Sequence, residues 1–218
     1  MKLNGTWYHN FEKLGINTKN DSIGYQKNQK VKEPEITKML DIVKGEDKIV
    51  NLLELFTSDG YYTFLTNKIL NVEKSTCVDY AEKYQPQFNQ IKEILGYDVN
   101  FIKSDVNAFL GKNKDRYDIT LCFGGLYHTD NPFEVIKKIN GFSKYTLIQT
   151  IVPSDIKGDY FVTPAPNWKH GSRFSVKTLR SEIEKLDCEI LYENYNELDK
   201  SIPTLNRGSV YFLIKYKK

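Results

Sequence analysis

The sequence predicts a single α/β domain built on a doubly wound, mostly parallel sheet of about seven strands. Short apolar runs of strand length alternate with helix-length amphipathic segments from residue 47 onward. The length of 218 residues is enough for one sheet covered on both faces. Acids and glycines recur directly after the strands, where open parallel sheets bind ligands. We therefore expect residues 1–218 to form one domain, with the sheet-based core in residues 47–218.

Seven runs of apolar and β-branched residues predict the strands. The first, at 49–53, is short, apolar and bounded by charged residues, as a buried strand is. The others are expected at 75–79, 99–103, 118–123, 145–152, 188–192 and 209–216. No helical pattern separates the last two, so they are expected to pair as antiparallel strands at one edge of the sheet.

Helical spacing of apolar residues predicts the elements between these strands. Helices are expected at 35–43, 61–70, 84–95, 132–140 and 176–186. Phe88, Ile91 and Leu95 share one side of the third, and Pro132 suits the first turn of the fourth. Strands joined by such helices form parallel sheets with right-handed crossovers. Residues 1–32 are polar and irregular, and are expected to be an N-terminal extension.

Composition excludes several classes of protein. The formal net charge is only +3 and the basic residues are spread along the chain, so a nucleic-acid surface is not favoured. No apolar run approaches the roughly 20 residues of a membrane helix, and the N-terminus lacks the pattern of a signal peptide. These features predict a cytoplasmic protein without membrane insertion.

The cysteines and histidines predict neither a disulfide nor a metal site. Cys77, Cys122 and Cys188 are odd in number, form no CxxC pair and fall in predicted strands, so we expect reduced, buried thiols. The three histidines lie far apart and have no HxxxH or cysteine partner.

The residues after the first four strands form the candidate cofactor site. They are Glu54, Phe56, Thr57, Ser58, Asp59 and Gly60, then Asp79 and Tyr80, then Asp105 and Val106, and finally Phe123, Gly124 and Gly125. An acid at the place of Asp79 is positioned to accept hydrogen bonds from both hydroxyls of a ribose. Asp105 is placed to accept from the amine of an adenine, and the Val106 amide to donate to a ring nitrogen.

The turn after the first strand distinguishes two cofactors. A dinucleotide requires a GxGxxG turn that lets the backbone approach its pyrophosphate. Phe56 and Ser58 stand where such glycines belong, and they would crowd a phosphate. S-adenosyl-L-methionine has no phosphate, so the turn favours that cofactor.

Four segments resemble the class I S-adenosylmethionine-dependent methyltransferases. These are "LLELFTSDGYYTF" at 52–64, "YDITLCFGGLYHTDNPFEVIKKI" at 117–139, "WYHNFEKLGINT" at 7–18 and "NWKHGSRFSVKTLRSEIEKLDCEI" at 167–190. Within that class the chain looks most like the tRNA wobble-uridine carboxymethoxy-forming enzymes and their small-molecule and glycan-pathway relatives. The resemblance implies a Rossmann-like fold and S-adenosyl-L-homocysteine as product. It also implies a small polar acceptor, such as a sugar, an amine or a phosphorylated intermediate.

The remaining candidate residues concern the acceptor. His128 and Tyr127 follow the fourth strand and are the candidate catalytic residues, because a histidine titrates near neutral pH. The candidate acceptor-binding residues are Trp7, Tyr8 and His9 in the extension, which suits a lid, and Trp168, His170 and Arg173 in the long segment 153–174.

Two other functions stay open on the sequence. One is a tRNA-modifying methyltransferase, which would need a basic surface around the site. The other is a non-catalytic ligand-binding member of the fold, suggested by Phe56 and Ser58 in place of glycines. The sequence distinguishes neither nitrogen from oxygen methylation nor one oligomeric state from another.

Overall fold

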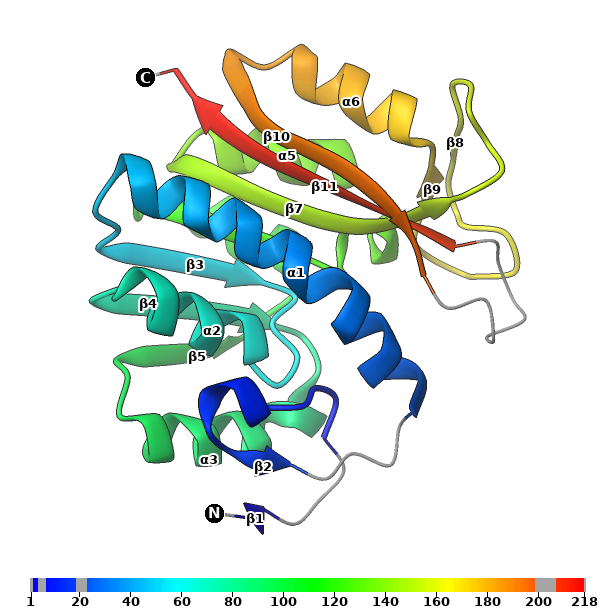
Figure 1. Cartoon of the computed structure of the whole chain (residues 1–218). Coiled ribbons are helices and arrows are strands. Elements are labelled where there is room, and N and C mark those ends of the chain that lie inside the picture. Colours follow the sequence, from blue (N-terminus) through cyan, green and yellow to red (C-terminus); the bar gives the residue numbers. More distant parts are fainter. Residues whose placement is uncertain (1, 4–6, 19–22, 199–206, 218) are drawn as a thin grey trace.

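The predicted sheet is present in a computed structural model that describes residues 2–3, 7–18, 23–198 and 207–217. Within these residues one sheet has seven strands in the order β10-β11-β7-β6-β3-β4-β5 (Figure 1). Its strands are β3 (Asn51–Leu55), β4 (Lys74–Asp79), β5 (Val99–Lys103), β6 (Tyr117–Phe123), β7 (Ser143–Pro153), β10 (Cys188–Glu197) and β11 (Arg207–Tyr216). The five strands β3 to β7 are parallel, and β11 pairs antiparallel with both β7 and the edge strand β10. The predicted fold class, with antiparallel pairing at one edge, is confirmed.

Helices cover both faces of this sheet. They are α1 (Ile23–Glu46), α2 (Tyr61–Leu70), α3 (Gln85–Leu95), α4 (Val106–Lys112), α5 (Pro132–Asn140) and α6 (Val176–Glu184). Apolar residues of α1, α2 and α3 pack in one buried cluster, and those of α4, α5 and α6 pack in another. Figure 1 shows α1 crossing the near face of the sheet in front of β3 and β7. The sheet is therefore doubly wound.

The alternation of side chains along β3 directs Glu54 toward α2. Leu53 and Leu55 belong to the cluster beneath α4 and α5, whereas Leu52 belongs to the opposite cluster. Because successive side chains of a strand point to opposite faces, Glu54 shares the face of Leu52. The acid consequently lies under the first turns of α2, where Thr63 meets it.

The first helix differs most from its prediction. The pattern predicted a helix at 35–43, whereas α1 runs over Ile23–Glu46 and continues through Pro34. Proline normally ends or kinks a helix because it lacks an N–H, which is why the sequence favoured a start after it. The inward residues before Pro34 are polar, since Asn28, Gln29 and Glu33 are buried. A polar inward face leaves no apolar periodicity for the sequence to reveal.

Shorter elements lie in the N-terminal extension, in the segment 153–174 and directly after two strands of the sheet. They are β1 (Lys2–Leu3), η1 (Glu12–Leu14) and β2 (Asn17–Thr18) near the N-terminus, η2 (Glu82–Tyr84) and η3 (Leu126–His128) after strands, and β8 (Phe161–Val162) and β9 (Arg173–Phe174) in the long segment 153–174. β8 and β9 pair antiparallel, so that segment is a small hairpin rather than a structureless loop.

Two of the three cysteines are buried as predicted, and the third is only half-buried. Cys77 and Cys122 are buried and Cys188 is half-buried, and all three are free. Burial raises the pKa of Cys77 and of Cys122 well above the usual thiol value. No helix in the described residues has the length and apolarity needed to cross a membrane.

Candidate functional site

A pocket of about 690 Å³ lies at the carboxyl ends of β3, β4, β5 and β6. This is the edge at which open parallel sheets bind ligands. The residues singled out from the sequence that line it are Tyr8, His9, Glu54, Phe56, Thr57, Ser58, Asp79, Tyr80, Asp105, Val106, Phe123, Gly124, Tyr127 and His128. Segments far apart in the sequence therefore meet at one cavity.

The turn after β3 adopts backbone angles that normally require glycine. Phe56 and Ser58 have φ values of +62° and +54°, and Gly60 has +80°. In this left-handed region a side chain is strained, so glycine is the usual occupant. The Phe56 N–H donates to the Val78 carbonyl at 2.9 Å, and this bond holds the turn against β4. The turn thus keeps a glycine-like backbone although two of its residues are not glycine.

Two glycines make room for aromatic rings around this turn. A Cβ on Gly125 would come within 1.9 Å of Phe56 Cγ, and a Cβ on Gly60 within 2.5 Å of the Phe88 ring. The Phe56 ring therefore lies against Gly125. Gly60 precedes the first residue of α2 and lies in the wall rather than on the pocket surface.

Glu54 is a buried acid at the floor of the pocket. Its side chain accepts hydrogen bonds from the Thr63 N–H at 3.1 Å and from the Thr63 hydroxyl. Desolvation raises the pKa of Glu54 to about 8. The bonds from Thr63 lower this pKa and the charge of Asp59 raises it, but both effects are smaller than that of desolvation. The carboxyl is therefore protonated at neutral pH, and a cationic group placed nearby would favour its ionisation.

Asp79 and Asp105 lie at the ends of adjacent strands. Asp79 accepts the Ser58 N–H at 2.7 Å through Oδ2 and the Ala81 N–H at 2.7 Å through Oδ1. Each carboxylate oxygen has a further lone pair for a ligand donor. Asp105 caps α4 by accepting the Ala108 N–H at 2.9 Å, and its side chain is exposed. The cap leaves the second oxygen of Asp105 available to the pocket.

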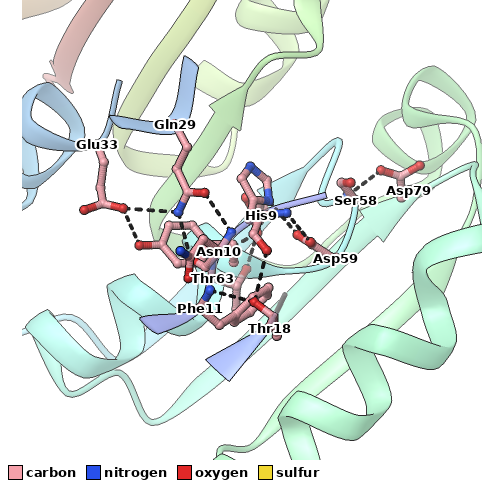
Figure 2. Close-up of polar contacts among 12 residues, drawn as sticks. His9, Asn10, Phe11, Thr18, Gln29, Glu33, Ser58, Asp59, Thr63 and Asp79 are labelled. Atoms are coloured by element: carbon pink, nitrogen blue, oxygen red, sulfur yellow. Dashed lines mark hydrogen bonds and ion pairs between the residues drawn. The ribbon is translucent and has the colours of Figure 1, made fainter. Parts of the chain in front are cut away.

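Asp59 joins the N-terminal segment to the pocket turn. It is fully buried, and its two oxygens accept the His9 backbone N–H at 2.8 Å and bond to His9 Nδ1 at 2.6 Å. Figure 2 shows this pair beside the Ser58–Asp79 bond. The His9 ring stacks on Tyr61 with centroids 5.2 Å apart. Asp59 therefore holds His9 at the pocket wall and does not itself line the pocket.

A second polar cluster ties the same segment to α1. The Asn10 N–H donates to Gln29 Oε1 at 2.8 Å, and Gln29 Nε2 donates back to the Asn10 carbonyl at 2.9 Å (Figure 2). Glu33 accepts from Gln29 Nε2 at 3.2 Å and from the Tyr61 hydroxyl.

Trp7 lies in the core against Phe11, outside the pocket. Of the three aromatic residues expected to form a lid, Tyr8 and His9 reach the cavity.

His128 lies between the pocket and a tryptophan. Its ring stacks on Trp168 at a centroid distance of 5.5 Å and an interplanar angle of 22°. Solvent reaches His128 through the open pocket, but surrounding protein atoms desolvate the ring. This desolvation, followed by the charge of Arg173, lowers the pKa of His128. The imidazole is therefore neutral at neutral pH.

Arg173 supports the residues around His128 from behind. Its guanidinium Cζ lies 4.5 Å from the Trp168 ring centroid and 5.5 Å from that of Tyr127, and Nη1 donates to the Ser172 carbonyl at 2.8 Å. Arg173 is buried and lies outside the pocket lining, as does Trp168. His170 is exposed at the surface, 3.4 Å from an Asp130 oxygen. The structure places these three residues around the pocket wall rather than in it.

Sequence reasoning missed several residues of the pocket. They are Lys32, Tyr62, Ala81, Lys83, Tyr84, Thr129, Gln149 and Arg207. Gln149 could have been noticed in the sequence, because a polar glutamine within the largely apolar strand β7 suggests a ligand contact. Lys32 carried no such signal, since it lies in the polar half of α1 that was not predicted as a helix.

Four residues of the pocket lining carry a buried polar atom without a partner among the described residues. Ser58 Oγ, Tyr62 Oη, Gln149 Oε1 and Arg207 Nε make no hydrogen bond within the described part of the chain. Buried polar atoms are rarely left unpaired, because desolvation then costs about 1–3 kcal/mol each. Their position suits a polar ligand with several donors and acceptors.

Comparison with known proteins identifies the fold. No family model and no curated protein matches the chain. Among solved structures, the N-terminal domain of EvdMO1 with SAH bound matches with a TM-score of 0.68 and 17% identity, over 94% of this chain and 88% of that one. Magnesium protoporphyrin IX methyltransferase (ChlM) from Synechocystis PCC 6803 with bound SAM matches with a TM-score of 0.65 and 11% identity, over 91% and 86%. The chain has the fold of the S-adenosylmethionine-dependent methyltransferases.

The methyltransferase fold does not by itself decide the reaction. The [4+2]-cyclase SpnF also matches, with a TM-score of 0.61 and 12% identity, over 84% of this chain and 80% of that one. Proteins with this fold therefore include a cyclase, so the chemistry has to be argued from the residues of the pocket.

Proposed function

We propose that this protein is an S-adenosylmethionine-dependent methyltransferase that acts on a nitrogen or oxygen of a small polar metabolite. The observation that carries the proposal is one pocket joining the glycine-like turn after β3 to acids at the ends of β4 and β5. Similar folds crystallised with SAH or SAM support the choice of cofactor. The cytoplasm suits the buried free thiols Cys77 and Cys122.

The residues at the strand ends fit the parts of this cofactor. Asp79 would accept both ribose hydroxyls, because each of its oxygens keeps an acceptor site. Asp105 and the Val106 amide would meet the adenine, and the exposed Tyr80 ring would lie beside it. The turn from Glu54 to Gly60 and the left-handed Gly124 would hold the methionine part. Its ammonium group would favour the ionised form of Glu54.

The acceptor would face His128, Tyr127 and Gln149. When bound, S-adenosylmethionine supplies a methyl group that an acceptor lone pair takes as the carbon–sulfur bond breaks, leaving S-adenosylhomocysteine. Positioning the acceptor is the main task of the protein in such a displacement. A neutral His128 is able to take the proton that the acceptor loses, and Gln149 Oε1 to accept its hydrogen bond.

The N-terminal segment would complete the acceptor side as part of one domain over residues 1–218. Tyr8 and His9 line the pocket, and Asp59 fixes His9 to the cofactor turn. A sugar is one candidate acceptor, since the EvdMO1 domain was also crystallised in the presence of SAH and D-fucose. Because Asp59 holds His9 through two hydrogen bonds, Tyr8 and His9 would exclude water from the pocket once the ligands are bound.

Calorimetric titration with S-adenosylmethionine and S-adenosylhomocysteine tests the cofactor. We expect micromolar binding to the wild type and at least a tenfold weaker affinity in Asp79→Ala, about 1.4 kcal/mol or more. Asp79→Asn keeps one acceptor oxygen and should lose less. Asp41→Ala, an exposed acid on α1, is the control. Absence of binding to the folded wild type would remove the proposal, and a gain of one methyl in a metabolite screen would identify acceptors.

A further inference from the structure

Charged residues divide the pocket into two halves. Asp79 and Asp105 lie at the ends of β4 and β5, toward one edge of the sheet. Lys32 and Arg207 line the same pocket from α1 and β11, toward the other edge. The sheet order places β7, β6 and β3 between β11 and β4. Asp79 and Asp105 therefore belong to the proposed cofactor half, which also contains Lys83 in η2. Lys32 and Arg207 belong to the half left for the acceptor.

The fold holds Lys32 and Arg207 close to each other. Arg207 begins β11 opposite Pro153, the last residue of β7, at the carboxyl edge of the parallel strands. Lys32 follows Val31, whose carbonyl accepts from Asn196 Nδ2 at 3.2 Å on the neighbouring strand β10. Desolvation, followed by the charge of Arg207, lowers the pKa of Lys32 to about 8. Two cations are thus placed together in a partly desolvated site.

Within the described residues, no carboxylate offsets the lowering of the Lys32 pKa by burial and by Arg207. The nearby acids of α1 are engaged elsewhere, since Glu33 bonds to Tyr61 and Lys13 and Glu35 bonds to Tyr192, Asn194 and Lys38. Arg207 Nε is a buried donor without a partner in the part of the chain that the structure describes. Two adjacent cations with an unused donor are unfavourable unless an anion joins them.

We propose that Lys32 and Arg207 form an anion-binding subsite, and that the methyl acceptor carries a carboxylate or phosphate group bound there. The inference rests on the proposed function, because it names the substrate class of the same pocket. Arginine binds either group through paired N–H donors, and lysine adds a point charge. Gln149 lies on β7 between this subsite and Gly124, so the reacting nitrogen or oxygen would meet it while the anion holds the far end.

Nuclear magnetic resonance titration tests the subsite directly. The probes are inorganic phosphate and acetate, added at constant ionic strength with and without saturating S-adenosylhomocysteine, and ethylene glycol is the neutral control. The readouts are the Arg207 Nε–H signal and the Gln149 side-chain amide. We expect a saturable shift with at least one anion, and about tenfold weaker affinity in Lys32→Gln and Arg207→Gln. Lys112→Gln removes an exposed lysine at the end of α4 and should retain wild-type affinity.

The same spectra separate failure of the subsite from failure of the cofactor proposal. Backbone signals of Ser58 and Gly124 report S-adenosylhomocysteine binding independently of the anions. No saturable anion shift, or equal affinity in the wild type and both subsite variants, would overturn the inference even where S-adenosylhomocysteine binds. Anion binding without S-adenosylhomocysteine binding would keep the subsite but remove its role in methyl transfer. Comparing phosphate with acetate identifies which group the acceptor carries.

Discussion

The Phe56 ring occupies the space beside Gly125 that a side chain at position 125 would need. A Cβ on Gly125 would lie 1.9 Å and 2.0 Å from Phe56 Cγ and Cδ2. Phe56 holds a left-handed backbone, with φ +62°, at the turn that forms the pocket floor. A phenylalanine in place of a motif glycine is therefore accommodated by Gly125, which follows β6, the neighbour of β3 in the sheet.

The Gly125→Ala substitution is expected to destabilise the protein through this contact. Its own φ of −118° suits alanine, so the cost arises from the clash with Phe56. Overpacking of this kind costs about 1–3 kcal/mol. Chemical denaturation measures the loss in Gly125→Ala, Phe56→Ala and the double variant. We expect a favourable coupling between the two substitutions. Gly111→Ala has open space around its Cβ and is the control; additive effects would contradict the contact.

Glu54→Gln is expected to remove a pH-dependent part of the stability. The folded-state pKa of Glu54 is raised from 4.5 to about 8, so folding favours its protonated form. This contribution is complete below pH 4.5 and is lost as pH rises toward about 8. Relative to the Gln variant, the wild type should therefore become less stable across that window. Denaturation at a series of pH values measures the difference, with the exposed Glu93→Gln as control. Parallel pH curves for wild type and Glu54→Gln would contradict a buried neutral acid.

Asp59→Asn is expected to loosen the N-terminal segment. The carboxylate accepts from both the backbone N–H and Nδ1 of His9, and one amide group is unable to replace both acceptors. Loss of such charge-assisted bonds costs about 1.5–3 kcal/mol. Hydrogen exchange at the His9 amide should become faster in this variant and stay unchanged in the exposed Asp41→Asn. Unchanged exchange in both would show that the aromatic stacking alone holds the segment.

His128 is expected to titrate below the ordinary histidine value of about 6.5. Desolvation is the main cause and the positive charge of Arg173 is the second. Replacement of Arg173 by Gln should raise the midpoint, whereas Arg173→Lys should keep it low. The imidazole signals of His128 in a pH titration measure each value. A midpoint above that of free histidine would mean that Asp79, which raises this pKa, dominates instead.

Prediction from the sequence succeeded where local pattern and edge geometry act together. Tyr61–Leu70, Val99–Lys103 and Pro132–Asn140 have the predicted bounds, because their apolar periods face a core. Asp79 and Asp105 reach one pocket because both end parallel strands of the same sheet. Prediction from the sequence missed the first part of α1, because the inward face of this helix before Pro34 is polar.

The doubly wound sheet and the acids at its carboxyl edge could be predicted from the residues alone, since strand period and chain order specify both. The set of polar side chains that share the pocket depends instead on how distant segments pack together. Lys32 and Arg207 are brought together by the packing of α1 on β10 and β11, and Trp7 is turned into the core while its neighbour Tyr8 reaches the cavity. Such pairings depend on contacts between residues far apart in the chain, and no local pattern encodes them.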